Sequence, residues 1–323
     1  MSELLKSIDA RTKLAGTNKL EILLFSLGTN SRTGRRETFG INVFKVREVM
    51  RTPPITSAPE MPSSVEGMVS LRGALVPVVD LAKYAGVMTD NPRSIMIVTE
   101  YAGHTQGFLV EAVDTILRLD WSQMKVPPEM LTAEMGGLVT AVTELPDGRL
   151  VMMMDVEKVL SETTHYDEES IYRNIEPLDV PEVTVLFADD SEVARRQIQR
   201  TLDAMNVKYI SAINGRDAWN ELEKIANYAT ASGQEACKLV SLVLTDVEMP
   251  EMDGYILTKR IKSDPRFAGI PVIMHSSLSG MSNQQLGKSV GVDEYVAKFE
   301  PHKLSETLSR RLKGALPVAQ ANS

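Results

Sequence analysis

Five polar residues stand at the ends of predicted strands, and their types suit phosphoryl chemistry. The first, third, fourth and fifth predicted strands of the C-terminal half are followed by Asp189 and Asp190, Asp246, Ser276 and Lys298, in that order. Carboxyl ends of parallel strands lie at one edge of a sheet, so we expect these side chains to converge there. A single acid after a strand is often a helix N-cap, but this ordered set favours a functional site.

The predicted carboxylate cluster suits a divalent cation. Asp189, Asp190 and Asp246 would repel one another as anions, and a bound cation removes that repulsion. A ligand set made only of oxygen atoms indicates Mg²⁺. An aspartate is already ionised at neutral pH, so Asp246 can attack phosphorus without a general base and form an acyl phosphate. Lys298 offers a compact positive charge for a phosphoryl oxygen, and Ser276 offers a hydroxyl.

The C-terminal half alternates between strand and helix patterns. The predicted strands are 183–188, 208–213, 240–245, 271–275 and 294–297. The predicted helices are 191–205, one starting at 216, 254–263, 283–290 and 301–313. This alternation predicts an α/β fold with a doubly wound, five-stranded parallel sheet.

The N-terminal half is dominated by short β-rich segments separated by turn residues. The predicted strands are 21–28, 38–43, 94–100, 106–113 and 149–154, and the short predicted helices are 44–50 and 156–161. Many short strands at this spacing predict a mainly-β fold, either barrels or a sandwich.

Charge and composition narrow the class of protein. Residues 161–182 hold seven acids and one base, which accounts for most of the net charge of −8. The stretch also contains Pro177 and Pro181, so we expect a solvated linker with at most one docked helical turn. No basic face is left to bind nucleic acid. No apolar run predicts membrane insertion or a signal peptide, so we expect a cytoplasmic protein.

These features divide the 323-residue chain. We expect an N-terminal extension (1–19), a β-rich domain (20–163), an acidic linker (164–182), an α/β domain (183–313) and a C-terminal tail (314–323). The single Cys237 excludes a disulfide framework within the chain. Few residues follow the last predicted helix, which argues against a DNA-binding regulator.

The C-terminal half resembles the receiver domains of response regulators. The resemblance lies in DVEMPEMDG (246–254) and LFADD (186–190), and extends over about 183–313. It implies a flavodoxin-like fold and phosphorylation of Asp246 by a histidine kinase. It also implies that Asp190, Asp246 and the Glu248 carbonyl bind Mg²⁺ directly, while Asp189 acts through water.

The same resemblance assigns a switch and shows one departure. Ser276 and Tyr295 match the hydroxyl and aromatic pair that rearranges on phosphorylation, and simple core packing is the less favoured alternative for Tyr295. The family usually has a cis proline after its lysine, whereas Phe299 follows Lys298 here. A cis bond without proline costs about 3–4 kcal/mol, so we expect a rearranged or strained turn.

The N-terminal half resembles the CheW family of chemotaxis coupling proteins. The matching stretches are LFSLG (24–28), FGI (39–41), KVREV (45–49), GMVSLRG (67–73) and VPVVDL (76–81). The resemblance implies a double SH3-like barrel that binds the histidine kinase CheA and chemoreceptor cytoplasmic tips. CheW is a further candidate partner. The family's partner surface corresponds to Val46 and Glu48, which we place on the short predicted helix, and to Arg72; core packing is the alternative for Val46.

A CheW-like module joined to a receiver resembles the CheV family. The resemblance implies an adaptor, recruited to receptor arrays, that couples chemoreceptors to CheA and is regulated by phosphorylation of Asp246. The sequence does not separate this role from that of a phosphate sink for CheA. An alternative from another class is a phosphohydrolase that forms an aspartyl phosphate at Asp246, with Glu248 as its general acid.

Overall fold

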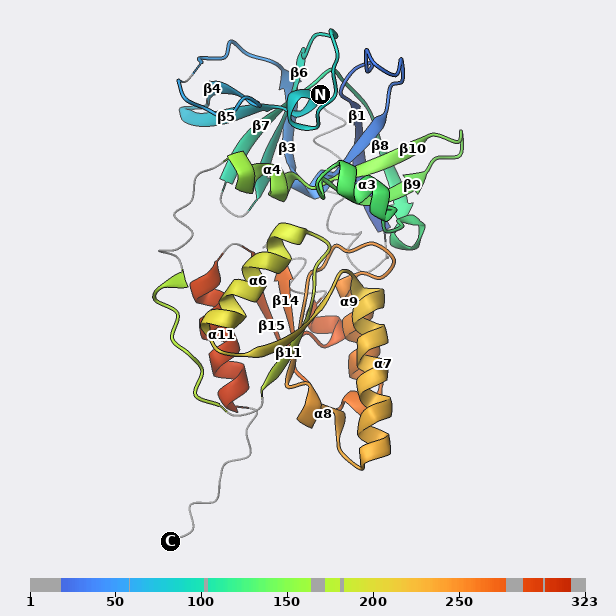
Figure 1. Cartoon of the computed structure of the whole chain (residues 1–323), viewed down its shortest axis with the longest axis vertical. Coiled ribbons are helices and arrows are strands. Elements are labelled where there is room, and N and C mark those ends of the chain that lie inside the picture. The colour runs from blue at the N-terminus through green and yellow to red at the C-terminus, as the bar shows by residue number, and fades with distance from the viewer. Residues whose placement is uncertain are drawn as a thin grey trace. The chain divides into compact units, whose positions relative to one another are not determined.

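A computed structural model describes seven segments of the chain: 19–57, 59–101, 104–163, 172–180, 183–276, 287–298 and 300–314. The chain divides into two compact units, one from Lys19 to Tyr166 and one that contains Asp167–Ser323 (Figure 1). Phe299 and the first part of the predicted helix 283–290 lie outside the described residues.

The first unit contains two five-stranded sheets. One has the strand order β8-β1-β2-β10-β9, from β1 (Lys19–Ser26), β2 (Thr38–Asn42), β8 (Ala112–Asp120), β9 (Val139–Glu144) and β10 (Leu150–Met154). The other has the order β3-β6-β7-β5-β4, from β3 (Val46–Arg51), β4 (Val65–Leu71), β5 (Ala74–Asp80), β6 (Ile95–Tyr101) and β7 (His104–Val110). The helices of this unit are α2 (Leu81–Tyr84), α3 (Glu129–Glu134) and α4 (Val156–Thr163), with the 3₁₀ turns η2 (Val43–Lys45) and η3 (Trp121–Gln123).

Each sheet of the first unit has its own hydrophobic core. Leu20, Ile22 and Leu24 of β1 are buried in the first core because they alternate along the strand and share one face. Val76 and Val78 of β5 occupy the equivalent positions in the second core. This β-rich architecture confirms the fold predicted for the N-terminal half.

The prediction of a helix over 44–50 is wrong. Only the 3₁₀ turn η2 forms, and residues Val46–Arg51 make strand β3, which pairs antiparallel with β6. Pairing with β6 satisfies the backbone groups of this valine-rich segment, so tertiary context decides its state. Val46 and Glu48 therefore lie on a strand, with a register shift between them.

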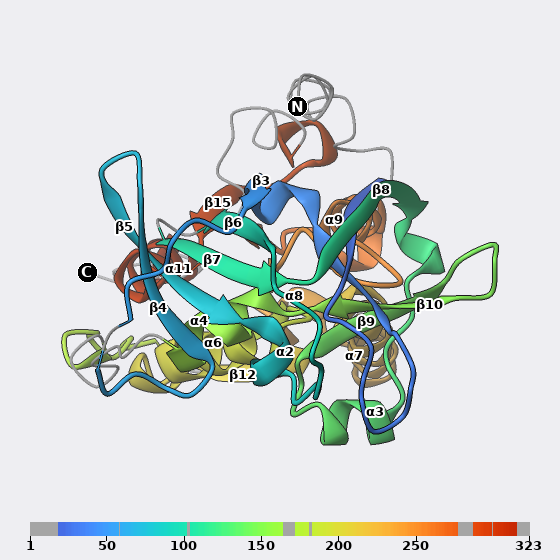
Figure 2. The same cartoon turned by 90° about the horizontal axis from the view of Figure 1, so that it is seen from above.

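The strands β4 and β5 form a hairpin with a two-residue turn. Arg72 and Gly73 occupy the turn, both with positive φ (50° and 87°), and Leu71 pairs with Ala74. Left-handed conformations at both turn positions match the twist of the flanking strands. Figure 2 shows the β4–β5 hairpin extending from its sheet.

The second unit has a parallel sheet of order β12-β11-β13-β14-β15. Its strands are β11 (Thr184–Ala188), β12 (Lys208–Ala212), β13 (Leu242–Thr245), β14 (Val272–Ser276) and β15 (Glu294–Ala297). Its helices are α6 (Glu192–Ala204), α7 (Gly215–Ser232), α8 (Ala236–Leu239), α9 (Gly254–Ser263) and α11 (Pro301–Gly314), with the 3₁₀ turn η4 (Pro265–Phe267). The order of the strands reverses beside β11, which confirms the predicted doubly wound fold.

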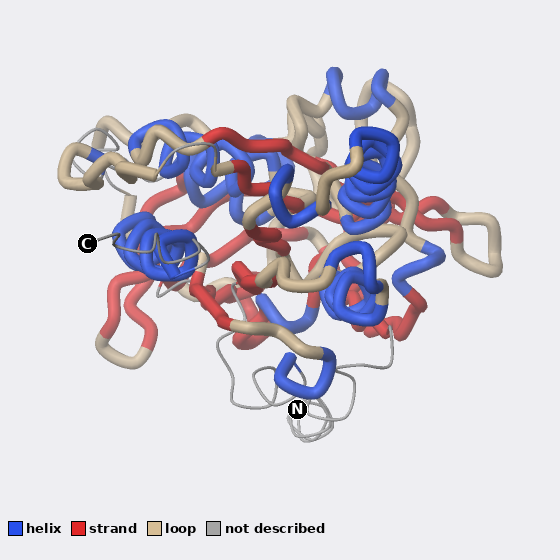
Figure 3. The backbone as a smooth tube through the Cα atoms, turned by 90° about the horizontal axis from the view of Figure 1, so that it is seen from below, coloured by secondary structure: helices blue, strands red, loops and turns tan. Residues whose placement is uncertain are grey.

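Helices cover both faces of the parallel sheet (Figures 1 and 3). Leu186 and Val243 face the core shared with α7 and α9, whereas Phe187 and Leu244 face the core shared with α6 and α11. Strands buried on both faces are continuously apolar, which explains the runs VLFA and LVLT.

Part of the predicted acidic linker packs on the second unit. Ile175 and Leu178 are 7% and 5% exposed and belong to the hydrophobic cluster of α6 and α11. The backbone N–H of Leu178 donates to the Met205 carbonyl at 2.8 Å, and the Arg200 guanidinium lies over the Tyr172 ring. We call residues 172–180 the strap. Among the described residues, no helix combines the length and apolar character needed to cross a membrane.

Candidate functional site

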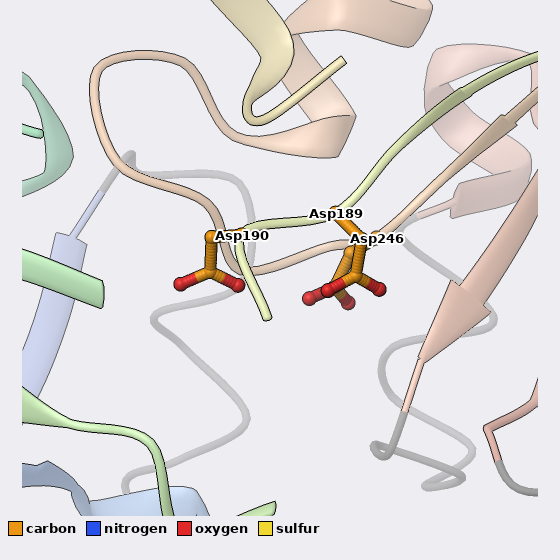
Figure 4. Close-up of side chains that lie close together, drawn as sticks. All are labelled: Asp189, Asp190 and Asp246. Atoms are coloured by element: carbon orange, nitrogen blue, oxygen red, sulfur yellow. The ribbon is translucent and has the colours of Figure 1, made fainter. Parts of the chain in front are cut away.

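Three carboxylates meet at the carboxyl edge of the parallel sheet. Asp189 and Asp190 follow β11, and Asp246 follows β13, the neighbouring strand. One ligand atom from each residue lies within 4.8 Å of the others, so the group could hold a metal ion (Figure 4). Asp189 and Asp246 are buried, at 0% and 5% exposure. The structure thus brings together the three acids that the sequence predicts as a cluster.

Lys298 bridges two of these carboxylates. Its Nζ atom lies 2.8 Å from Oδ2 of Asp189 and 2.9 Å from Oδ2 of Asp246. The side chain is only 2% exposed. Burying charges is favourable only when they are paired, and here one ammonium group offsets the repulsion between two anions.

Backbone donors hold the two buried carboxylates in place. The Ser191 N–H donates to Asp189 Oδ1 at 2.9 Å, and the Val247 N–H donates to Asp246 Oδ1 at 2.6 Å. These bonds occupy the Oδ1 atoms, whereas the Oδ2 atoms contact Lys298. Both side chains therefore have fixed orientations at the edge of the sheet.

The loop after Asp246 is held by close backbone contact. A Cβ on Gly254 would lie 2.0 Å from the Asp246 carbonyl oxygen, so only glycine fits this position. The Gly254 N–H donates to the Val247 carbonyl at 2.9 Å, and the Asp253 carboxylate caps α9 by accepting from the Ile256 N–H. The segment DVEMPEMDG thus forms a closed loop that returns to its own start.

Ser276 and Tyr295 lie on neighbouring strands. Ser276 ends β14 and is 3% exposed, and its carbonyl accepts from the Lys298 N–H at 3.2 Å. The Tyr295 hydroxyl lies 3.4 Å from the Tyr255 hydroxyl, and a Cβ on Gly287 would lie 2.0 Å from the Tyr295 hydroxyl oxygen. Burial raises the pKa of both tyrosines. Tyr295 is therefore packed inward against α9 and Gly287.

Two predictions about this site stay untested. The Glu248 carbonyl stays a predicted ligand for the cation. The departure from the family pattern at Phe299 falls outside the described residues.

The predicted partner residues of the first unit differ in their surroundings. Arg72 Nη2 lies 2.9 Å from Glu48 Oε2, and the Arg72 side chain is 70% exposed. Val46 is 7% exposed, in agreement with the core-packing alternative. Arg72 and Glu48 thus form one surface pair, and the partner role of all three residues stays a prediction.

Two residues near the site were not predicted from the sequence. Arg195, on the first turns of α6, donates to the backbone of the acidic pair, and Tyr255 contacts Tyr295. An arginine soon after an Asp-Asp pair is a usable sequence signal, whereas the meeting of Tyr255 with Tyr295 depends on how α9 packs.

Two family models match the chain. The CheW-like domain matches residues 21–164, and the response regulator receiver domain matches residues 185–309. "Chemotaxis protein CheV3" of Helicobacter pylori is 30% identical over 280 residues, which cover 85% of this chain and 88% of that protein. The chain belongs to the CheV family.

Other proteins are similar to all or part of this chain. "Chemotaxis protein CheV1" of Helicobacter pylori is 29% identical over 332 residues, covering 97% of this chain and 99% of that protein. The crystal structure of the scaffolding protein TtCheW from Thermoanaerobacter tengcongensis is 29% identical, with a TM-score of 0.38, and covers 42% of this chain and 84% of that one.

Membership of the CheV family establishes the class of function. The chain is a chemotaxis adaptor with a phosphorylatable receiver domain, as its sequence predicts. The comparisons do not favour the phosphohydrolase alternative.

Proposed function

We propose that Asp246 is the phosphoacceptor and that its phosphorylation regulates how residues 20–163 couple chemoreceptors to CheA. The observation that carries this proposal is the buried Lys298 bridge to Asp189 and Asp246, beside the third carboxylate of Asp190. A phosphoryl group on Asp246 would lie beside the Lys298 ammonium, which favours the added negative charge.

The residues of the site fit Mg²⁺. Asp189, Asp190 and Asp246 supply hard oxygen ligands within 4.8 Å of one another, and we add the Glu248 carbonyl as a proposed ligand. When bound, Mg²⁺ supplies positive charge that offsets the negative oxygens of the transferring phosphoryl group.

The phosphoryl transfer follows from the arrangement of the side chains. A carboxylate oxygen of Asp246 attacks phosphorus, the bond from phosphorus to the donor histidine of CheA breaks, and that imidazole takes up a proton. Lys298 stabilises the charge on the phosphoryl oxygens. The product is an acyl phosphate on Asp246.

The proposed switch uses the two residues at the ends of β14 and β15. The phosphoryl group adds about −1.5 to −2 of charge and new acceptor oxygens. The Ser276 hydroxyl donates a hydrogen bond to one of these oxygens, and Tyr295 changes its packing against Tyr255 and Gly287. This rearrangement alters the surface that the receiver presents to the rest of the signalling complex.

The coupling unit supplies the partner surface. We propose that Glu48 and Arg72 contact CheA or a chemoreceptor tip, and that Val46 supports the strand that carries Glu48. CheW is a further candidate partner in the array. A phosphate-sink role for CheA remains the second candidate, since it uses the same chemistry at Asp246.

The test is phosphoryl transfer from labelled CheA or acetyl phosphate to the full chain. Asp246→Asn should take up no label, Asp190→Asn should take it up slowly because cation binding is weaker, and the exposed Asp203→Asn should match the wild type. Hydroxylamine should release the label, because it attacks acyl phosphates but not phosphoserine. Full labelling of Asp246→Asn would overturn the proposal.

A second measurement distinguishes regulated coupling of receptors to CheA from the phosphate-sink role. Receptor-controlled CheA activity is measured with the wild type and with Asp246→Asn, at a concentration of this protein too low to drain phosphate from CheA. A change in kinase control at this concentration supports regulated coupling. An effect that appears only at high concentration supports the sink.

A further inference from the structure

Arg195 makes two short contacts with the acidic pair. Its Nη1 atom donates to the Asp189 carbonyl oxygen at 2.9 Å and to the Asp190 carbonyl oxygen at 3.0 Å. The side chain is half-buried on α6, and its own backbone N–H donates to the Ser191 carbonyl at 3.0 Å. Hydrogen bonds from a charged donor are about twice as strong as neutral ones.

These contacts fix the turn that carries two of the three carboxylates. The chain leaves β11 at Ala188 and enters α6 at Glu192, so Asp189 and Asp190 form most of the connection. A peptide group that is held in place also fixes the direction of the adjoining Cα–Cβ bond. Arg195 therefore fixes the direction in which the Asp190 side chain leaves the backbone.

We propose that Arg195 is a positioning residue for the cation site. Its guanidinium holds the peptide groups of Asp189 and Asp190 so that their carboxylates face a common point with Asp246. The inference rests on the proposed Mg²⁺ site and adds a residue that does not touch the ion. Outer partners of this kind typically change metal affinity by about 10–100-fold.

The positive charge of Arg195 and its hydrogen bonds to the turn should have opposite effects on cation affinity, so replacing Arg195 distinguishes them. A positive side chain near three carboxylates repels a cation, so removal of its charge alone would strengthen cation binding. Loss of the two carbonyl contacts lets the turn relax, which weakens cation binding. The direction of the change in affinity therefore decides between the two roles.

The experiment measures Mn²⁺ binding to the full chain by electron paramagnetic resonance, with Mg²⁺ as competitor. Arg195→Ala should weaken binding about 10-fold. Arg195→Lys should restore most of the affinity, because an ammonium group can still donate to the carbonyls. Arg196→Ala is the matched control, since Arg196 is exposed on the same helix and pairs with Glu192; it should bind like the wild type.

A kinetic readout separates positioning from general damage to the fold. With acetyl phosphate as donor, Arg195→Ala should need about 10-fold more Mg²⁺ for half-maximal labelling, while the rate at saturating Mg²⁺ stays near that of the wild type. If Arg195→Ala fails to fold, Arg195→Met takes its place with the same expected direction, because methionine keeps a long side chain but has no hydrogen-bond donor.

The outcomes are distinct. Unchanged or tighter binding by the alanine variant, or by its methionine substitute, would overturn the positioning role and leave the proposed cation site standing. If Arg195→Lys does not restore Mn²⁺ affinity, the positioning role is also overturned. No Mn²⁺ binding by the wild type would instead remove the proposed cation site itself.

Discussion

The Nζ atom of Lys298 lies 2.9 Å from Oδ2 of Asp246, although their strands β15 and β13 are not neighbours, because β14 runs between them. The same Nζ atom reaches Asp189 after β11, so one side chain ties together the ends of three strands. Lys298 therefore supports the fold at the carboxyl edge as well as the chemistry.

Replacement of Lys298 should destabilise the receiver in a way that a cation partly reverses. In the presence of a chelator, we expect Lys298→Met to lower the free energy of unfolding by about 3–5 kcal/mol. The reason is that the buried carboxylates of Asp189 and Asp246 lose the ammonium group that pairs with them. Added Mg²⁺ should stabilise the variant more than the wild type. Chemical denaturation with and without Mg²⁺ measures both effects.

The control for this prediction is Lys303→Met. Lys303 is 58% exposed and pairs with Glu300 at the surface, so its loss should cost less than about 1 kcal/mol. Equal losses for the two variants would contradict a special role for the buried lysine.

Arg72 should matter more for partner binding than for stability. The Arg72–Glu48 pair is exposed, and such pairs contribute about 0–1 kcal/mol to folding. We expect Arg72→Ala to keep its thermal midpoint but to bind CheA or receptor about 10-fold more weakly, as loss of an interface arginine often does. Isothermal titration and thermal unfolding of the same samples measure the two quantities.

Arg149→Ala is the matched control for Arg72. Arg149 precedes β10 on the other sheet of the same unit and is 51% exposed, and its partner Asp147 is 53% exposed. Weaker binding by both variants would indicate a general charge effect, and a lower midpoint for Arg72→Ala would make Arg72 structural.

The chemistry of the site was predictable from the sequence because it depends on strand ends. Asp189, Asp190 and Asp246 follow strands with continuous apolar runs, Lys298 follows the short strand EYVA, and a parallel sheet brings such positions together. The loop DVEMPEMDG was specific enough to predict the class of domain.

Other features depend on tertiary contacts that no local pattern contains. Residues 44–50 look helical until β6 supplies a pairing edge for Val46–Arg51. The strap has few apolar residues, so its sequence predicted a solvated linker with at most one docked helical turn. In the structure, Ile175 and Leu178 pack in the hydrophobic cluster of α6 and α11. Tyr255 meets Tyr295 only because α9 packs against that part of the sheet.

The strap should contribute to the stability of the receiver. Leu178 is 5% exposed in the cluster of α6 and α11, so Leu178→Ala should cost about 2–5 kcal/mol. Trp219 reports unfolding of this unit alone if Trp121 is first replaced by Phe, because the chain has two tryptophans. Urea denaturation followed by fluorescence then gives the loss.

Asp179→Ala is the control, since Asp179 is exposed beside Leu178 on the same strap. Its free energy of unfolding should stay within about 0.5 kcal/mol of the wild-type value. If Leu178→Ala behaves the same way, the strap is not docked in solution.

Tyr255 should make the receiver less stable at high pH. Burial, followed by its hydrogen bond with Tyr295, raises the pKa of Tyr255 above its usual value of 10.0. In the unfolded chain the hydroxyl ionises near pH 10, whereas in the folded protein it stays protonated. The contribution of Tyr255 is thus fully present below about pH 10, and the free energy of unfolding falls as pH rises above that value.

The steepness with which the free energy of unfolding falls with pH tests whether Tyr255 is responsible. One such tyrosine lowers the free energy of unfolding by about 1.4 kcal/mol per pH unit above its unfolded pKa. Tyr255→Phe removes the ionising hydroxyl, so urea denaturation between about pH 9 and about pH 11 should show a shallower decline for this variant than for the wild type. The control variant is Tyr228→Phe, at a side chain that is 63% exposed. Identical slopes for the wild type and Tyr255→Phe would mean that Tyr255 ionises as readily in the folded receiver as in the unfolded chain, and its buried contact with Tyr295 would then be absent in solution.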